Sequence, residues 1–302
     1  MPIQDFNFDA LKQYVTSSKD THLKSLAQEH GKRYIGSTSS TTSVLAHFHY
    51  LLSQWRPINS TMLSKSFPNE SQNFTELLRS PAAIFLKWQD GSYAIDADKQ
   101  FDQANVLSLL GKSMEKFLTL RTEDFERYRR TKEEGALPPS DSDAPEAYNY
   151  SALGDFLLRS QLDAHDSRLP GTGMFDLKTR AVVSIRMDVR NYEMGLGYQI
   201  KDNQGDFESY EREYHDMIRA AFLKYSMQVR MGRMDGIFVA FHNVERIFGF
   251  QYMSIEEMDF AIHGQRDLSL GDQEFVMSLD LLNKILNRAT EKFPKTVSDP
   301  ST

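Results

Sequence analysis

The stretch Gln161–Arg186, QLDAHDSRLPGTGMFDLKTRAVVSIR, constrains the fold more than any other part of the chain. Its pattern is typical of two β-strands joined at the turn-forming sequence PGTG. The second strand carries the triplet Asp176-Leu177-Lys178. Because successive side chains of a strand point to opposite faces, the carboxylate and the lysine share one face and the leucine lies on the other. What this triplet can do depends on the partner strand.

A two-residue turn with Gly171-Thr172 at its centre predicts the register of this hairpin. Leu169 then faces Met174, and Asp163 shares the face of the carboxylate and lysine of the triplet. Asp166 falls on the opposite, apolar face. A one-residue slip or a three-residue loop would exchange the two acids, so both remain candidates, with Asp163 favoured.

The residue types on the acidic face indicate a metal site. Two carboxylates on adjacent strands make an oxygen-rich site suited to Mg²⁺ or Mn²⁺. Such an ion lowers the pKa of a bound water and offsets charge on a phosphate. Lys178 could orient the attacking water or stabilise the transition state, and the backbone carbonyl of Leu177 could complete the coordination. The alternative is a surface strand on which Asp176 and Lys178 only form a salt bridge.

Composition excludes several other classes of site and protein. Of the 302 residues, 40% are hydrophobic and 25% are charged, which is typical of globular chains, and no run approaches the ~18 apolar residues of a membrane span. The absence of cysteine excludes disulfides, thiolate zinc sites and a cysteine nucleophile. A net charge of −7 argues against a general basic coat for nucleic acid, but not against a local basic groove. The first residues predict neither a secretory signal nor a transit peptide within this chain.

The chain after residue 100 predicts a mixed α/β core with one central β-sheet flanked by helices. Besides the hairpin, the elements expected there are a helix over Asn105–Leu120, a long helix over Glu208–Met231, strands over Gly236–His242 and Arg246–Ser254, and a helix over Asp272–Lys292.

Residues 1–100 are expected to form a helical and β-hairpin extension packed on the core at 101–302. The hairpin lies in PAAIFLKWQDGSYAIDAD, with its turn at Asp90-Gly91. A helix over Val44–Trp55 follows the Ser/Thr-rich break Lys32–Ser43, which is expected to be a loop or helix cap. A mobile linker is expected near 133–150, where Pro, Ser and Asp are frequent.

This ordered set resembles the PD-(D/E)xK phosphodiesterase superfamily. Its restriction-endonuclease-like core has a helix with Glu, a strand with Asp, a partner strand with (Asp/Glu)-x-Lys, and a further helix that can add a Gln. By this resemblance Glu115 matches the helix glutamate and a metal ligand, and Asp163 matches the first strand acid. Asp176 and Lys178 match the D-x-K pair, and Gln228 in KYSMQVR matches the helix glutamine. No proline precedes the first strand acid, and the tyrosine that often follows the glutamine by four residues is absent.

Three stretches resemble, more specifically, a fungal mitochondrial family of the petite series implicated in RNA 5′-end processing and decay. They are KRYIGSTSSTTSVLAHFHYLLS, SPAAIFLKWQDGSYAIDAD with LLGKSMEKFLTLRT, and the organising stretch itself. The resemblance covers most of residues 30–255. It implies a longer parent protein in the mitochondrial matrix and a divalent-metal ribonuclease of 5′→3′ polarity acting on single-stranded mitochondrial transcripts. It also implies mitochondrial RNA polymerase or other RNA-decay factors as partners.

Arginines near the hairpin are candidates for contacts with RNA phosphates, foremost Arg159 and Arg180 on the acidic face, and Arg186 beyond them. Two other functions remain open. The chain could be a non-catalytic RNA-binding or scaffold protein that keeps a nuclease fold. It could also be a DNA-directed nuclease of the same superfamily, because the sequence shows no reader of the 2′-hydroxyl.

Overall fold

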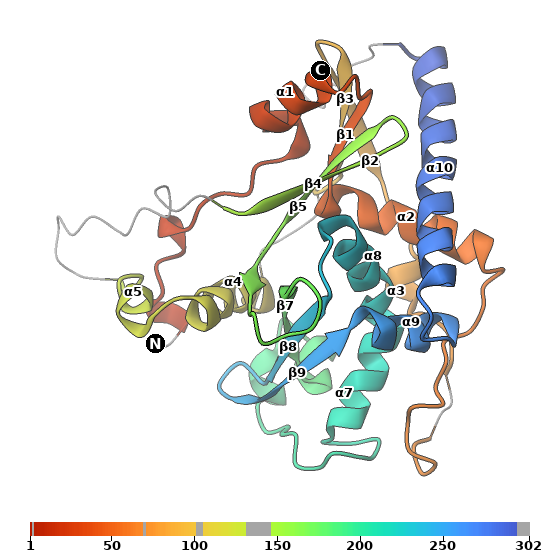
Figure 1. The fold of residues 1–302 in the computed structure, drawn as a ribbon. Coiled ribbons are helices and arrows are strands. Elements are labelled where there is room, and N and C mark those ends of the chain that lie inside the picture. Colours follow the sequence, from red (N-terminus) through yellow and green to blue (C-terminus); the bar gives the residue numbers. More distant parts are fainter. Residues whose placement is uncertain (2, 69–70, 101–104, 131–145, 295–302) are drawn as a thin grey trace.

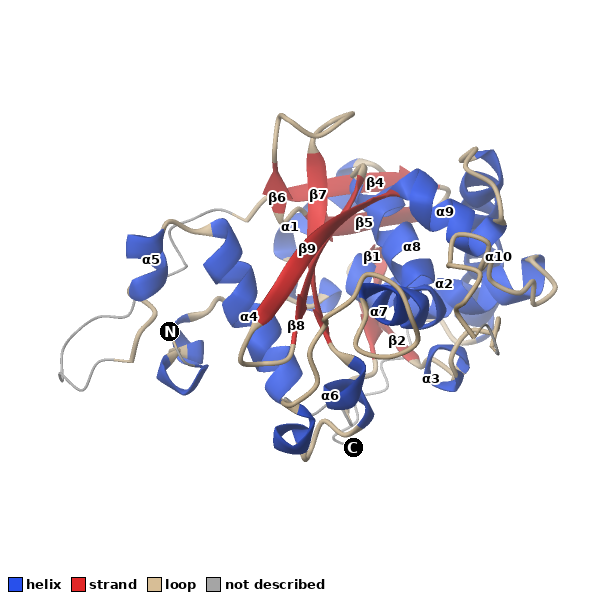
Figure 2. Ribbon diagram, turned by 90° about the horizontal axis from the view of Figure 1, so that it is seen from below, coloured by secondary structure: helices blue, strands red, loops and turns tan. Residues whose placement is uncertain are grey.

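Two mixed β-sheets, of five and four strands, form the framework of the chain (Figure 1). The computed structural model describes residues 1, 3–68, 71–100, 105–130 and 146–294. Helices flank both sheets, so the predicted mixed α/β class is confirmed (Figure 2). The expectation of one central sheet was wrong, because the strands divide between two sheets.

The five-stranded sheet joins the beginning of the chain to its middle. Its strands, in spatial order, are β2 (Ile84–Gln89), β3 (Ser92–Ala97), β1 (Tyr34–Ser37), β5 (Phe156–Gln161) and β4 (Tyr148–Leu153). Strand β1 runs parallel to both β3 and β5, and the two outer strands are antiparallel to their neighbours. Strands from 1–100 and from 101–302 therefore share this sheet, and the division at residue 100 stays a prediction about folding units.

The four-stranded sheet carries the triplet. Its strands, in spatial order, are β6 (Ala164–His165), β7 (Met174–Ala181), β8 (Gly236–His242) and β9 (Ile247–Ser254). Strands β7 and β8 pair in parallel, with Asp176 beside Ile237, and the outer strands are antiparallel. Strand β8 is buried along most of its length and has the bounds that its apolar run predicts.

Ten α-helices of the described residues surround the sheets. They are α1 (Thr21–Glu29), α2 (Thr38–Leu52), α3 (Glu76–Arg79), α4 (Val106–Thr119), α5 (Thr122–Glu126), α6 (Val183–Met187), α7 (Tyr210–Met217), α8 (Leu223–Gly232), α9 (Ile255–His263) and α10 (Ser269–Lys292). A π-helical turn, Ile218–Phe222, joins α7 to α8 within the expected long helix. None of the helices in the described part of the chain is long and apolar enough to cross a membrane.

The structure bears on two expectations about irregular segments. Helix α2 begins at Thr38, so half of the Ser/Thr-rich break, residues 38–43, is helical, and Ser37 caps the helix as the cap interpretation expects. Hydroxyls bond the first turn: the amide of Ser37 donates to Ser40 Oγ at 3.0 Å and Thr41 Oγ1 donates to the Ser37 carbonyl at 2.8 Å. The linker expected near 133–150 stays a prediction, although its last residues, 148–150, belong to β4, which is paired with β5. Its residues 133–145 lie outside the described residues.

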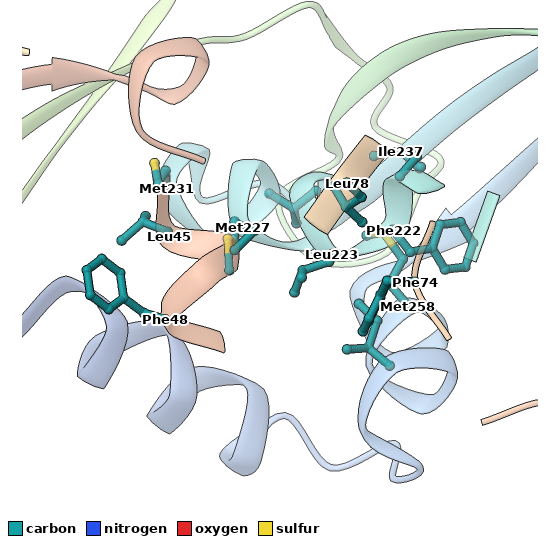
Figure 3. Close-up of a cluster of buried hydrophobic side chains, with 14 of the residues drawn as sticks. Leu45, Phe48, Phe74, Leu78, Phe222, Leu223, Met227, Met231, Ile237 and Met258 are labelled. Carbon is teal, nitrogen blue, oxygen red and sulfur yellow. The ribbon is translucent and has the colours of Figure 1, made fainter. Parts of the chain in front are cut away.

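Helix α8 lies between the two sheets, in contact with β4 and β5 of one and β8 of the other (Figures 1 and 2). Its buried Leu223 and Met227 belong to a hydrophobic cluster (Figure 3). The cluster also contains Leu45 of α2, Phe222 of the π-helical turn, and Ile237 of β8. Each such side chain contributes about 1.5–3 kcal/mol on burial. The cluster therefore fixes α8, and the side chains on its other face, relative to both sheets.

A buried polar network joins α2, α9 and α10 away from the triplet. Glu274 lies 2.7 Å from His49 Nδ1, and Arg56 donates to both Glu274 Oε1 at 2.7 Å and His263 Nδ1 at 2.9 Å. His263 Nε2 lies 3.7 Å from Asp259. The ligand atoms of the two histidines and the glutamate lie within 4.8 Å of one another, a spacing that could hold a metal ion. Arg56 already provides the cationic partner of this cluster, so we interpret it as a structural network.

Acid should weaken the fold through this network. Burial lowers the pKa of His263 from its ordinary value of 6.5 to about 3. As the pH falls below 6.5, the unfolded chain therefore binds a proton at this histidine that the folded protein does not bind. Burial opposes the charge of Glu274, but His49 and Arg56 bring its pKa down to about 2. Both contributions to stability are present at neutral pH and are lost as the pH falls. We expect the free energy of unfolding by urea to fall by about 1–2 kcal/mol between pH 7 and pH 5.

The matched comparison is His263→Gln against His30→Gln, a change at an exposed histidine. The first should make the pH dependence of the unfolding free energy less steep, and the second should not. Equal pH dependence in wild type and both variants would contradict this account of the network.

Candidate active site

The chain crosses from one sheet to the other at Leu162-Asp163. Gln161 ends β5 in the five-stranded sheet, and the next two-residue strand, Ala164–His165, belongs to the four-stranded sheet. The single strand expected from Gln161 onward is therefore divided. At the crossing, Asp163 Oδ2 accepts a hydrogen bond of 2.9 Å from the Leu177 amide, which holds this carboxylate against β7.

The two-residue turn was wrong, but the faces that it predicted are correct. Met174 pairs with His165 rather than with the expected Leu169, a shift of four residues. Because four is even, every side chain stays on its predicted face. Continuing the observed pairing of Ala164 with Phe175 by one residue sets Asp163 opposite Asp176.

A long-range contact explains the longer connection over residues 166–173. The Asp235 carboxylate, next to β8, accepts hydrogen bonds from the Thr172 amide at 2.8 Å and the Thr172 hydroxyl at 2.5 Å. The Asp166 amide donates to the Gly173 carbonyl at 3.0 Å and closes the loop. Gly173 has a φ of 71°, and a Cβ there would lie 2.6 Å from the Asp166 carbonyl oxygen, so this position requires glycine.

Asp166, the alternative first acid, lies in this loop. It pairs with Arg168 at 2.6 Å, which together with a backbone hydrogen bond lowers the pKa of its carboxyl to about 2. It does not line the cleft described next, whereas Asp163 does.

A cleft of about 270 Å³ brings together all five residues that the sequence predicts to be catalytic: Glu115, Asp163, Asp176, Lys178 and Gln228. They come from α4, the sheet crossing, β7 and α8, which are distant in the sequence. The other residues that line the cleft are Tyr14, Ser37, Thr38, Ser39, Tyr148, Arg159, Gln161, Leu177 and Met234.

Negative charge is crowded in the cleft. Asp176 is only 6% exposed. The pKa of Asp163 is raised to about 9 by burial, by a hydrogen bond shared with Asp176, and by the charge of Asp176. Burial also raises the pKa of Glu115. The free protein therefore holds a proton on Asp163 beside the second aspartate, because two buried carboxylates so close together cannot both ionise cheaply.

Lys178 is the cation that contacts the carboxyl groups of the cleft. Its Nζ lies 2.5 Å from Asp176 Oδ2 and 5.2 Å from the centre of the Tyr225 ring. Burial opposes its charge, but Asp176, Tyr225 and Asp163 raise the pKa of Lys178 above its ordinary value. The salt bridge expected of a surface strand is thus present, but it lies within a cleft beside two further carboxyl groups. Asp176 balances this ammonium, and Glu115 and Asp163 remain as carboxyl groups without it.

The donor set fits Mg²⁺ or Mn²⁺, which prefer oxygen ligands. Glu115, Asp163 and Asp176 supply carboxylates. The Leu177 carbonyl points to the edge of β7 that bears Asp163, because the amide and carbonyl of one strand residue face the same edge and this amide bonds to Asp163. The short β6 pairs only with Met174 and Phe175, so it does not extend to this carbonyl. Gln228 Oε1 is buried without a hydrogen-bond partner among the described residues.

The arginines predicted to contact RNA are engaged or enclosed within the protein. Arg159 is 4% exposed, forms an ion pair with Asp20, and donates to a backbone carbonyl at 2.7 Å. Arg186 pairs with Glu213. Burial lowers the pKa of Arg180 to about 10. Their roles as RNA contacts stay predictions.

Several residues of the cleft were missed from the sequence. The Tyr14 hydroxyl lies 2.7 Å from Ser37 Oγ and 2.6 Å from Ser39 Oγ, at the N-terminus of α2. The Ser/Thr-rich break was interpreted only as a cap or loop, so this hydroxyl cluster was not foreseen. Gln161, two residues before Asp163, lies on the acidic face in the predicted register and lines the cleft, although it was not named as a site residue.

Comparison with known proteins agrees with the resemblance seen in the sequence. Residues 14–287 match the family model described as mitochondrial protein Pet127. The chain belongs to the Pet127 family. It is 41% identical over 303 residues to the Schizosaccharomyces pombe mRNA degradation protein pet127, mitochondrial, with 98% of this chain and 56% of that protein covered. The match confirms the predicted family. The description of the family confirms the prediction that the protein is mitochondrial.

A second Pet127 relative comes from Saccharomyces cerevisiae, and its name describes a candidate component of the mitochondrial translation system. It is 46% identical over 256 residues, which cover 83% of this chain and 30% of that protein. The chain thus spans about half of the length of the first relative (56%) and 30% of the length of the second.

Among solved structures, the chain is similar to two fungal proteins. One is Kluyveromyces lactis Dxo1 in complex with manganese (TM-score 0.43, 12% identity, 95% of this chain and 68% of that chain covered). The other is Scheffersomyces stipitis Rai1 (TM-score 0.38, 12% identity, 94% and 72% covered).

Replacing Asp163 by asparagine should stabilise the protein free of metal. The raised pKa of Asp163 means that folding becomes costlier as the pH rises from its ordinary 3.8 towards about 9. An amide can still accept the Leu177 hydrogen bond and donate to Asp176, without that cost. We expect Asp163→Asn to raise the free energy of unfolding by about 1 kcal/mol or more at pH 8 and by less at pH 5.

Mn²⁺ should stabilise the wild type more than Asp163→Asn. It should raise the melting temperature of the wild type more than that of Asp163→Asn, because only the wild type keeps both aspartates. Asp166→Asn is the control, since that acid lies outside the cleft. A variant that is no more stable than wild type at pH 8 and gains equally from Mn²⁺ would contradict the assignment.

Proposed function

We propose that this chain is a metal-dependent ribonuclease module that acts in mitochondrial RNA degradation and 5′-end processing, with 5′→3′ polarity, in the mitochondrial matrix. The observation that carries the proposal is the convergence of Glu115, Asp163, Asp176 and Lys178 in one cleft. The name of the S. pombe relative, an mRNA degradation protein, supports RNA as the substrate. Mitochondrial RNA polymerase and other RNA-decay factors stay predicted partners.

The reaction is hydrolysis of a phosphodiester. Water attacks phosphorus, the P–O3′ bond breaks, and the leaving oxygen takes a proton. A divalent cation bound here would supply an activated water and offset the charge that builds on the phosphate. The three carboxyl groups would hold the ion, and Asp163 would do so as the carboxylate, without its proton.

In this proposal Lys178 stabilises charge on the phosphate, and Gln228 accepts a hydrogen bond from the attacking water. The buried ammonium of Lys178 is fixed by Asp176 and Tyr225, so it offers a positive charge that needs no rearrangement during the reaction. The Gln228 carbonyl oxygen has no hydrogen-bond partner among the described residues and can accept a hydrogen bond from water.

Degradation of a single-stranded RNA in the presence of Mn²⁺ tests the proposal. We expect Asp176→Asn and Lys178→Ala to lower the rate by at least about 100-fold, because each removes charge that acts on the transition state. Asp166→Asn should retain wild-type activity. Equal rates in wild type, Asp176→Asn and Lys178→Ala would refute a catalytic role for this cleft. RNA binding in EDTA without any cleavage in Mn²⁺ would instead support the scaffold alternative.

The same assay measures polarity and substrate class. With 5′→3′ polarity, a 5′-labelled RNA should lose its label as a mononucleotide at once, whereas a 3′-labelled RNA should pass through progressively shorter products. Comparison of 5′-monophosphate with 5′-triphosphate RNA gives the preferred end. Single-stranded DNA in competition separates the DNA-directed alternative, for which it should be the better substrate.

A further inference from the structure

A second hollow adjoins the catalytic cleft. Both hollows are lined by Tyr14, Glu115 and Gln161, so they lie side by side, and together they are called the groove. The outer part is also lined by Leu11, Lys12, Lys112, Lys116 and Glu146. Its three lysines outnumber its two glutamates, Glu115 and Glu146, so this outer part has an excess of positive charge next to the crowded carboxylates of the inner part.

Helix geometry explains why two of these lysines flank the groove. Lys112 and Lys116 are four residues apart on α4 and therefore share a face of the helix, while Glu115 reaches the inner cleft. Lys12 precedes Tyr14 on the opposite, N-terminal segment. Lys12 and Lys112 are exposed, and neither forms an ion pair with another residue of the described ranges.

We propose that the outer part of the groove, defined by Lys12, Lys112 and Lys116, binds phosphates of a single-stranded RNA whose chain continues into the cleft. The inference rests on the proposed nuclease function, which requires the RNA backbone to approach three carboxyl groups. Such an approach needs nearby positive charge, and a lysine ammonium is a mobile point charge suited to phosphates. Arg159 and Arg186 are already paired with acids.

This assignment also explains how a chain of net charge −7 can hold a polyanion. A local row of cations lowers the energy of phosphates within about one Debye length, ~8 Å at physiological salt, whatever the charge of the distant surface. α4 lies on the opposite side of the molecule from α10, so these lysines are separate from the cations of the C-terminal helix (Figures 1 and 2).

The test compares two triple variants of equal net charge. One carries Lys12→Ala, Lys112→Ala and Lys116→Ala. The matched control carries Lys65→Ala, Lys284→Ala and Lys292→Ala, at exposed lysines that line none of the groove. Binding of a short fluorescent oligouridylate is measured in EDTA, so that no RNA is cut, over a series of salt concentrations.

We expect the groove variant to bind at least about 10-fold more weakly than wild type at low salt. The slope of log affinity against log salt should be smaller by roughly 2, about 0.7 for each lost phosphate contact. The control variant should match wild type in slope. Equal slopes in both triple variants, or no wild-type binding at low salt, would overturn the inference.

Cleavage by the wild type with Mn²⁺, measured in parallel, separates the two proposals. Normal lysine-dependent binding without cleavage would refute the nuclease function and leave the RNA-binding groove standing. Cleavage that depends on Asp176, with RNA binding that does not depend on the three lysines, would refute the groove alone.

Discussion

The hydrogen bond from the Leu177 amide to Asp163 is the interaction on which the site depends. It ties the point where the chain changes sheets to the strand that carries Asp176 and Lys178. Two carboxylates are thereby held together in a buried place, which raises the pKa of Asp163 to about 9. Such an arrangement costs folding free energy in the free protein. A bound divalent cation would remove that cost, because it replaces the proton as the positive partner of the pair.

The parts of the fold that could be predicted from the sequence are those whose signal is local. β8 is a continuous apolar run, and the β2–β3 hairpin has its Asp90-Gly91 turn. β1 is only Tyr34–Ser37 and is followed by a Ser/Thr run, so nothing nearby marks it as the central strand of a sheet. Its pairing with β5 joins residues more than a hundred positions apart, which periodicity cannot reveal.

The site was predictable to the extent that it follows from alternation along strands. The face shared by Asp163, Asp176 and Lys178 survived a register error of four residues, because only an odd shift exchanges faces. The length of the loop was not predictable, since Asp235 fixes it from a distant part of the chain. The internal acids that pair with Arg159 and Arg186 were equally hidden, so the sequence overstated how accessible those arginines are.

Calorimetric titration of Mn²⁺ into the metal-free protein tests the central claim most directly. The proposal predicts that the wild type binds the ion, that Asp163→Asn binds it at least about 10-fold more weakly, and that Asp166→Asn binds it as the wild type does. Equal affinity of wild type and Asp163→Asn for Mn²⁺, or no binding by the wild type, would contradict a metal centre in this cleft.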